Sequence, residues 1–251
     1  MSRGVDPVAG SETSMASASR LGLYSAILTA VMTVVTFGLA ITAIPNSGSG
    51  CRANCFEYPY PDTLSEFPED YLWMPPAMIL VVIYVVLVSS IHAHASLQKK
   101  VYGQIGLSFA LIAAGVLLCD YFVQFSVVPI SLMKGQSEGI ALLNQYNPYG
   151  VFIVLEELGY LLMALSFAFL APVFAGGGRL ATTVRWIFVA GFAVTMVFLV
   201  AISVAHGLDR MDRFEIAAIS IDWLVLAING VLLSLLFRRQ LKASRGSQGG
   251  D

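Results

Sequence analysis

Six long apolar stretches, separated by short polar segments, set the pattern of the chain. None contains a basic residue, and each is long enough for the ~20 residues that cross a ~30 Å hydrocarbon core. The predicted spans are residues 21–44, 74–95, 102–132, 149–175, 186–205 and 214–237. All have helical lengths, whereas the strands of a membrane barrel would alternate over ~10 residues. The pattern therefore predicts an all-α polytopic membrane protein with six transmembrane helices.

Proline and small polar residues mark the limits of this predicted domain. The pair Pro75 and Pro76 suits the start of the second helix, because proline lacks an N–H that would be unpaired there. Pro129 is expected to kink or end the third helix. Residues 1–19 are rich in Ser, Gly and Ala and have no apolar period. They are predicted to be a disordered tail, as are residues 240–251, on either side of a membrane domain of residues 20–239.

Composition narrows the class of protein further. Of the 251 residues, 57% are hydrophobic and 12% are charged, whereas an ordinary soluble domain carries about 25% charged residues. This excludes a water-soluble globule, and it excludes a disordered chain because such chains have low hydrophobicity. A formal net charge of −2 with no basic stripe also excludes a nucleic-acid partner.

Basic residues are distributed unevenly between the two sets of loops. With the N-terminus inside, ten Lys and Arg residues fall in the tails and inner loops, and four fall in the outer loops. Inner loops of membrane proteins retain an excess of Lys and Arg. Both termini are therefore predicted to be cytoplasmic.

The loop after the first span, about residues 45–72, is acidic and contains Cys51 and Cys55. On an oxidising outer face these two cysteines are predicted to form a disulfide. Free thiols and half of a metal site are the alternatives, but zinc needs four ligands and no second ligand pair lies nearby. No metal site is therefore predicted. Cys119, within the third span, is expected to be a reduced packing residue.

Two histidines, His92 and His94, lie near the inner end of the second span. Two residues apart on a helix, their side chains point about 200° away from each other and cannot chelate one ion. We interpret them as polar residues at the membrane interface.

Acidic residues interrupt the predicted spans at Asp120, Glu156, Glu157 and Asp222. No Lys or Arg lies within a span to neutralise them. A carboxylate in hydrocarbon costs about 2.5 to 3.5 kcal/mol on insertion scales, so such residues usually face a bundle interior or a watery cavity. They are the candidates for a functional site.

Helix geometry places three of these acids at similar depth, because Asp120, Glu156 and Asp222 all lie in the outer half of their spans at a rise of ~1.5 Å per residue. Their helical faces carry further polar residues, namely Gln124, Tyr160, Glu215 and Asn229. We predict an outward-opening pocket among the third, fourth and sixth spans. Its predicted lining is Asp120, Gln124, Glu156, Tyr160, Asp222 and Asn229.

Two questions about this pocket stay open in the sequence. Glu157 points about 100° away from Glu156, so one of the two is expected to face the pocket and the other a neighbouring helix. The alternative to a functional pocket is a structural role, in which protonated carboxylic acids act as hydrogen-bond donors between helices.

No catalytic or nucleotide-binding motif is present, because the chain lacks a P-loop, a GxSxG elbow, an HExxH pair, a Rossmann fingerprint and a CxxCH haem motif. We therefore predict no cofactor and assign no catalytic residue. The chain also shows no convincing internal repeat, which argues against an inverted-repeat transporter.

A resemblance to a known family comes from four segments: CRANCFEYPYPDT, FPEDYLWMPPAM, DYFVQFSVVPISL and QYNPYGVFIVLEELGYL. Over roughly residues 20–175 the chain resembles an uncharacterised family of small bacterial six-span integral membrane proteins. The resemblance implies a bacterial cytoplasmic (inner) membrane and carries no activity, so no site residue is transferred from it. A weaker similarity, in size and lone acids only, is to membrane-embedded terpene cyclases and serves as an analogy.

Three functions agree with these features. In the first, the acidic pocket binds or transports a cation, a proton or a small molecule, and the lipid bilayer is the other partner. In the second, the chain is an intramembrane enzyme in which a neutral acid protonates an apolar lipid or terpenoid substrate. In the third, it is a structural or accessory membrane subunit whose acids serve packing. The sequence assigns no oligomeric state.

Overall fold

The computed structural model describes the backbone of residues 7–42 and 46–247, and the side chains of residues 17–42 and 46–244. Over these residues the chain is helical and contains no strand. Six of its helices are long and apolar enough to cross a membrane, as the sequence predicts. These helices fit a multi-pass membrane protein.

The long helices are α1 (Pro7–Ala40), α2 (Met74–Ala93), α3 (Lys100–Ser126), α6 (Val151–Leu170), α7 (Arg179–His206) and α8 (Arg213–Ser247). Two short helices lie between α3 and α6, namely α4 (Val128–Met133) and α5 (Ile140–Leu143). The remaining turns are 3-10 helices: η1 (Gly48–Gly50), η2 (Pro61–Glu66), η3 (Glu69–Tyr71), η4 (Leu97–Lys99) and η5 (Ala171–Phe174).

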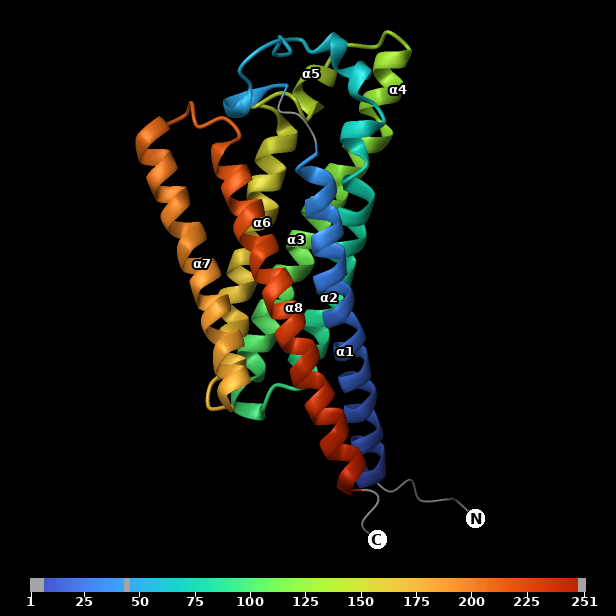
Figure 1. The fold of residues 1–251 in the computed structure, drawn as a ribbon, viewed down its shortest axis with the longest axis vertical. Helices are drawn as coiled ribbons and strands as arrows, with labels where there is room; N and C mark the ends of the chain where they lie inside the picture. Colours follow the sequence, from blue (N-terminus) through green and yellow to red (C-terminus); the bar gives the residue numbers. More distant parts are fainter. Residues whose placement is uncertain (1–6, 43–45, 248–251) are drawn as a thin grey trace.

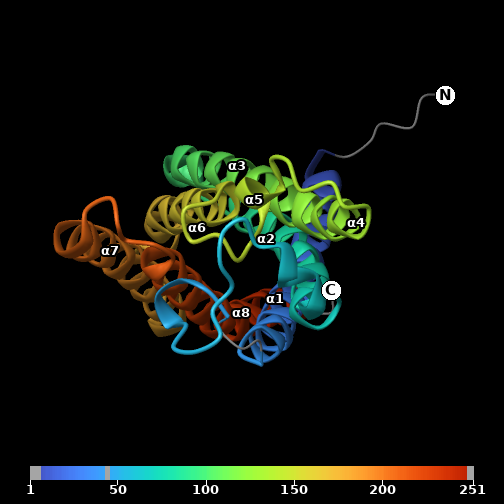
Figure 2. The same cartoon turned by 90° about the horizontal axis from the view of Figure 1, so that it is seen from above.

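Five of the long helices form a closed ring, and the sixth packs on its outside. Around the ring α1 contacts α2, α2 contacts α3, α3 contacts α6, α6 contacts α8, and α8 returns to α1. Among the long helices, α7 packs extensively only against α6 and α8. Figure 2 shows α7 at the periphery of the bundle. The connections α2–α3, α6–α7 and α7–α8 are short and make these consecutive helices antiparallel neighbours.

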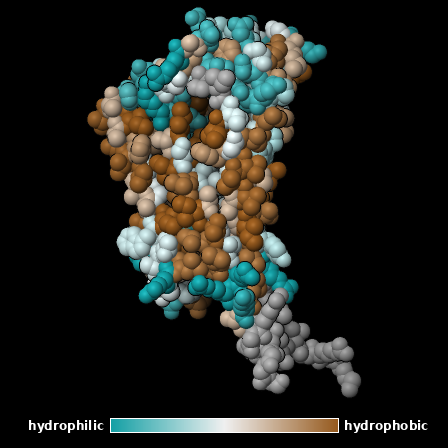
Figure 3. Space-filling view, in the orientation of Figure 1, coloured by the Kyte–Doolittle hydropathy of each residue, from teal (hydrophilic) through white to brown (hydrophobic). Residues whose placement is uncertain are grey.

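The two ends of the bundle differ in composition and structure (Figure 1). We call one end the disulfide end, because it carries the segment of residues 46–73 together with α4, α5 and the α7–α8 turn. We call the other the terminal end, where α1 begins and α8 ends. Figure 3 shows a hydrophobic band between hydrophilic caps at these two ends, which is the distribution expected of a chain that crosses a bilayer.

The predicted disordered tails are wrong within the described residues. Helix α1 begins at Pro7 and α8 continues to Ser247, so residues 7–19 and 240–247 are helical. Once an apolar span has nucleated a helix, each added residue gains a hydrogen bond without a new nucleation step. The start of the first span is also held in place, because Ser19 Oγ lies 2.7 Å from His94 Nε2 on α2. Residues 1–6 and 248–251 lie outside the described residues.

The third predicted span is broken where the sequence places Pro129. Helix α3 ends at Ser126, and α4 starts at Val128 with the proline in its first turn. A proline inside a continuous helix would remove one backbone hydrogen bond and clash with the preceding turn. Figure 1 shows α4 beyond the end of α3, at the disulfide end.

Candidate functional site

The acidic residues of the long helices point into the bundle. Asp120 is 4% exposed, Glu156 is 1% exposed, and Asp222 is fully buried. A fourth acid, Glu215 in the first turn of α8, is 8% exposed and was not among the predicted pocket residues. The only signal for it in the sequence is its position seven residues before Asp222, on the same helical face.

A chain of hydrogen bonds leads from α8 to Glu156 through two tyrosines. The indole N–H of Trp223 donates to the Tyr160 hydroxyl at 3.1 Å, which lies 2.9 Å from the Tyr121 hydroxyl. The Tyr121 hydroxyl donates to Glu156 Oε1 at 2.6 Å. Because Tyr121 uses its single proton on Glu156, Tyr160 must be the donor between the two tyrosines. Each of these three hydrogen bonds is therefore donated in the direction of the Glu156 carboxylate.

The other neighbour of the Glu156 carboxyl is a second carboxyl. Glu215 lies beside Glu156 in the wall of one cavity, and the two carboxyls interact. Two adjacent ionised carboxylates repel each other unless a proton or another positive charge lies between them. Since Tyr121 already donates to Glu156, the negative charge is best placed on Glu156 and the proton on Glu215.

Both carboxyls line a cavity of about 170 Å³ at the disulfide end. Its walls come from α6, from α8, from Trp73 at the start of α2 and from the loops above them. Four of its lining residues are acidic and none is basic. The lining is Asn46, Ser47, Asp70, Trp73, Gln145, Tyr146, Phe152, Ile153, Glu156, Asp212 and Glu215.

The loop over this cavity is fixed by the predicted disulfide and by a helix-turn contact. Cys51 and Cys55 are joined, with their Cα atoms 5.9 Å apart. The backbone N–H of Ser49 donates to Asp212 Oδ1 at 2.8 Å, which ties the loop to the α7–α8 turn. Gly48 adopts φ +67°, and a Cβ there would lie 2.2 Å from Asp212 Oδ2. Only glycine allows this close approach.

A tyrosine closes another side of the cavity. The Tyr146 hydroxyl donates to Asp70 Oδ2 at 2.8 Å. Burial and this hydrogen bond raise the pKa of Tyr146 well above its usual range. The hydroxyl therefore stays a neutral donor at physiological pH and keeps Asp70 oriented.

Glu157 takes a different role from its neighbour. Its carboxylate forms an ion pair with Arg210 from the α7–α8 turn, and it does not line the cavity. Sequence reasoning missed this partner because Arg210 lies in a loop, outside every span. Glu156 faces the cavity, and Glu157 faces the turn beside it.

The remaining predicted pocket residues do not line this cavity. Gln124 Nε2 donates to the Tyr71 hydroxyl at 3.2 Å, and Asn229 Nδ2 donates to the Val184 carbonyl at 3.4 Å. Among the described side chains, Asp120 Oδ2 and both Asp222 oxygens have no hydrogen-bond partner. Of the six predicted residues, only Glu156 lines the cavity, while Tyr160 supports it through Tyr121.

Aromatic rings surround the hydrogen-bonded chain. Trp73 contacts Tyr121 edge-to-face with ring centroids 5.2 Å apart, and Trp223 with centroids 6.5 Å apart. Trp223 in turn lies edge-to-face with Tyr160 at 6.4 Å. The carboxyl pair therefore lies next to an aromatic wall built from α2, α3, α6 and α8, whose faces favour positive charge.

An apolar groove runs along the seam between α1 and α8. It consists of two cavities of about 260 and about 270 Å³ that share Phe37, Ser220 and Trp223. The part nearer the disulfide end is also lined by Trp73 and Glu215, which line the acidic cavity as well. Glu215 is therefore common to both openings.

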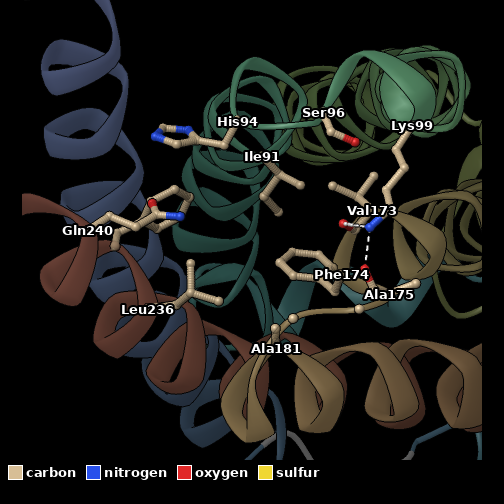
Figure 4. Close-up of a pocket in the computed structure, with 13 residues that line it drawn as sticks. Ile91, His94, Ser96, Lys99, Val173, Phe174, Ala175, Ala181, Leu236 and Gln240 are labelled. Carbon is tan, nitrogen blue, oxygen red and sulfur yellow. Dashed lines mark hydrogen bonds between the residues drawn. The ribbon is translucent and has the colours of Figure 1, made fainter. Parts of the chain in front are cut away.

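A further cavity, of about 290 Å³, lies at the terminal end (Figure 4). There the Lys99 ammonium donates to the carbonyls of Val173, at 3.4 Å, and of Ala175. His94 bonds the Ser90 carbonyl at 2.8 Å through Nδ1. These polar groups are satisfied by the protein itself, as in a helix C-terminus capped by a cation.

Within residues 7–42 and 46–247, no group of three or more His, Cys, Asp or Glu side chains is placed to hold a metal ion. The carboxyl pair, its cavity and the groove are the features from which a function can be inferred. No protein-family model, no curated protein and no solved structure matches this chain.

Proposed function

We propose that this protein binds a cation at its disulfide end, with Glu156 and Glu215 as the anionic groups. The observation that carries the proposal is a pair of buried carboxyls, Glu156 and Glu215, that line one cavity with no basic residue in its lining. Buried charges are normally paired, as Glu157 is by Arg210. Glu156 instead has a tyrosine donor and other acids, Asp120 and Glu215, around it.

A cation can take the place of the proton that the pair shares. Two carboxylates around one positive charge form a neutralised site, whereas two adjacent carboxylates without it repel each other. Asp70 and Asp212 add negative charge at the same cavity. A cleft lined by one sign of charge concentrates counter-ions and raises their association rate.

Binding from one side is better supported than transport. The terminal-end cavity shares no lining residue with the acidic one. Between them the Tyr84 hydroxyl donates to Ser166 Oγ at 2.8 Å, and Ser166 donates to the Gly106 carbonyl at 2.8 Å. This layer is fully buried and joins α2, α6 and α3. This buried layer between the two cavities favours binding from one side over transport.

The disulfide end is assigned to the outside of a bacterial cytoplasmic membrane, with both termini in the cytoplasm. Two features support this assignment: the excess of Lys and Arg at the terminal end, and a disulfide at the other end. A reporter inserted after Tyr58 should behave as external and one at Gly177 as cytoplasmic. The reverse result would place the acidic cavity on the inner side.

The cation site can be tested by binding of tetramethylammonium to the purified protein in lipid nanodiscs, measured by calorimetry. Saturable binding should be lost in Glu156→Gln and Glu215→Gln. The control is Glu138→Gln, which removes an exposed acid from the same end of the molecule and should leave binding unchanged. Equal binding by all four proteins, or by none, would contradict the proposal.

A second candidate is an intramembrane enzyme that protonates an apolar lipid. It is favoured by one observation, that the groove leads to Glu215, the acid on which we place the proton. Incubation of lipid extracts with the protein should then yield a new isomer, and the yield should fall in Glu215→Gln. An unchanged lipid profile would count against this reaction.

A further inference from the structure

We propose that the ligand is a single-chain lipophilic cation that reaches the site sideways from the bilayer. Its charged group would lie against Glu215 and Glu156, and its chain would lie in the groove between α1 and α8. This inference rests on the proposed cation site and adds the ligand class and the direction of access.

The groove exists because α1 and α8 approach closely only in their terminal halves. At Gly230 a Cβ would lie 2.9 Å from the Ala26 carbonyl oxygen, and at Gly22 a Cβ would lie 2.6 Å from the Phe237 ring. Glycines thus let the two helices touch near the terminal end. Figure 1 shows them diverging toward the disulfide end, where the groove lies.

The walls of the groove are suited to a hydrocarbon chain. They consist of apolar residues, two hydroxyl side chains and Glu215, namely Thr33, Val34, Phe37, Ala40, Ile41, Trp73, Glu215, Ile216, Ile219, Ser220, Trp223, Leu224 and Ala227. The Thr33 hydroxyl is already bonded to the Thr29 carbonyl at 2.7 Å, so it presents no unpaired donor. A chain in this groove would replace lipid tails without having to desolvate a polar wall.

Charge complementarity indicates which head group the hydrocarbon chain of the ligand carries. The groove ends at Glu215, whose neighbours include Glu156 and Asp212, so an anionic head group would be repelled. A neutral chain would gain nothing from the carboxyl pair. An ammonium group gains the charge of the pair and the ring faces of Trp73 and Trp223, which line the groove beside Glu215.

Glu215 links the two openings in a way that suits an amphiphile. It lines both the acidic cavity and the groove, as does Trp73. An amphiphile can therefore keep its head group next to the polar cavity while its chain stays at membrane depth. A small inorganic cation would use the cavity alone and leave the groove without a role.

The test uses dodecyltrimethylammonium and tetramethylammonium as probes, which share a head group and differ in the chain. Binding is followed by tryptophan fluorescence in nanodiscs, in a Trp186→Phe background that leaves Trp73 and Trp223 at the site. Empty nanodiscs correct for partitioning of the long chain into lipid. Dodecanoate, with the same chain length and opposite charge, should not bind.

The groove is blocked by Ser220→Phe, and Val231→Phe is the matched control. Val231 lies on the same helix, is 53% exposed and does not line the groove. Ser220→Phe should weaken dodecyltrimethylammonium binding by about tenfold, equivalent to about 1.4 kcal/mol, and leave tetramethylammonium binding unchanged. Val231→Phe should change neither. Ala227→Leu serves as a second blocking variant if Ser220→Phe loses thermal stability.

The outcomes separate this inference from the cation site itself. If both blocking variants bind dodecyltrimethylammonium normally while Glu215→Gln abolishes binding of both probes, the cation site stands and the groove proposal is wrong. If dodecanoate binds as well as the ammonium probe, the ligand class is wrong. If Glu215→Gln changes the binding of neither probe, both proposals fail.

Discussion

At the terminal end of the bundle, a half-buried ammonium is satisfied by the backbone carbonyls around it, and at the disulfide end a buried carboxylate faces a second carboxyl. Lys99 donates to the carbonyls that end η5. Glu156 receives a hydrogen bond from Tyr121 and lies against Glu215. The first arrangement is complete without a ligand. In the second, no basic residue lines the cavity to balance the charge of the carboxylate.

The same contrast holds for the seam between α1 and α8. Its terminal half is closed by glycines that allow backbone contact, and its other half is open along Phe37 and Trp223. The same pair of helices is thus closely packed in its terminal half and separated by a groove in its other half. Substitutions should therefore have opposite effects in the two halves of the seam.

The largest expected effect is at the closed part of the seam. In Gly230→Ala the new Cβ would lie 2.9 Å from the Ala26 carbonyl oxygen and from the Ala30 backbone nitrogen, so α1 must shift. We expect a loss of about 1 to 3 kcal/mol in the free energy of unfolding, as for other overpacked interiors. Thermal unfolding in nanodiscs would measure it. Gly38→Ala on α1 meets no atom within 4 Å and should be neutral or slightly stabilising.

A somewhat smaller loss of stability is expected from a substitution of Lys99 at the terminal end. Lys99→Met keeps the apolar stem and removes the ammonium that caps the carbonyls of Val173 and Ala175. Unpaired carbonyls should lower the free energy of unfolding by about 1 to 2 kcal/mol. Binding of tetramethylammonium should not change. Lys100→Met, at the exposed neighbouring lysine, is the control; equal losses in both variants would show that the capping contact contributes nothing.

Local patterns were sufficient to predict much of the fold. The bilayer constrains each helix by its own length and composition, so the six helices, the break at Pro129 and the Cys51–Cys55 disulfide could be predicted from short stretches of sequence. The tails were predicted wrongly because a helix can extend beyond the apolar period that starts it.

The candidate site was harder to predict because it depends on which helices touch. Depth along each span placed Asp120, Glu156 and Asp222 in one layer, but their lateral order follows from the ring, in which α6 lies between α3 and α8. Glu215 was missed as a pocket residue because the start of a span is expected to be interfacial. Arg210 was missed because only packing of α7 beside α6 brings its turn to Glu157.

At the disulfide end, a substitution of Glu215 is expected to increase the stability of the protein. Glu215→Gln removes one of two adjacent acids and retains a donor for Glu156, so it should raise the free energy of unfolding by about 1 kcal/mol while abolishing tetramethylammonium binding. Thermal unfolding and calorimetry on the same sample would show both effects. A destabilised Glu215→Gln protein would instead identify the carboxyl pair as a structural cross-link between α6 and α8 and favour the accessory-subunit function.

The smallest expected effect concerns the donors behind the pair. Tyr121→Phe removes the hydroxyl that donates to Glu156 at 2.6 Å. The hydrogen bonds of Tyr160 and Trp223 are then no longer connected to the carboxylate. The Glu156 carboxylate that a cation would meet then lacks one hydrogen bond that stabilises its charge. Tetramethylammonium affinity should then fall by about fivefold, equivalent to about 1 kcal/mol for one hydrogen bond.

The matched control for this variant is Tyr84→Phe. It removes a hydroxyl that is equally buried and that donates to Ser166 Oγ at 2.8 Å, in the layer between the two cavities. Both variants should lower thermal stability by a similar amount, but only Tyr121→Phe should weaken binding. If the two variants weaken binding equally, the tyrosine at Glu156 acts through general packing, and the directed chain of donors has no role in holding the anion that a cation would meet.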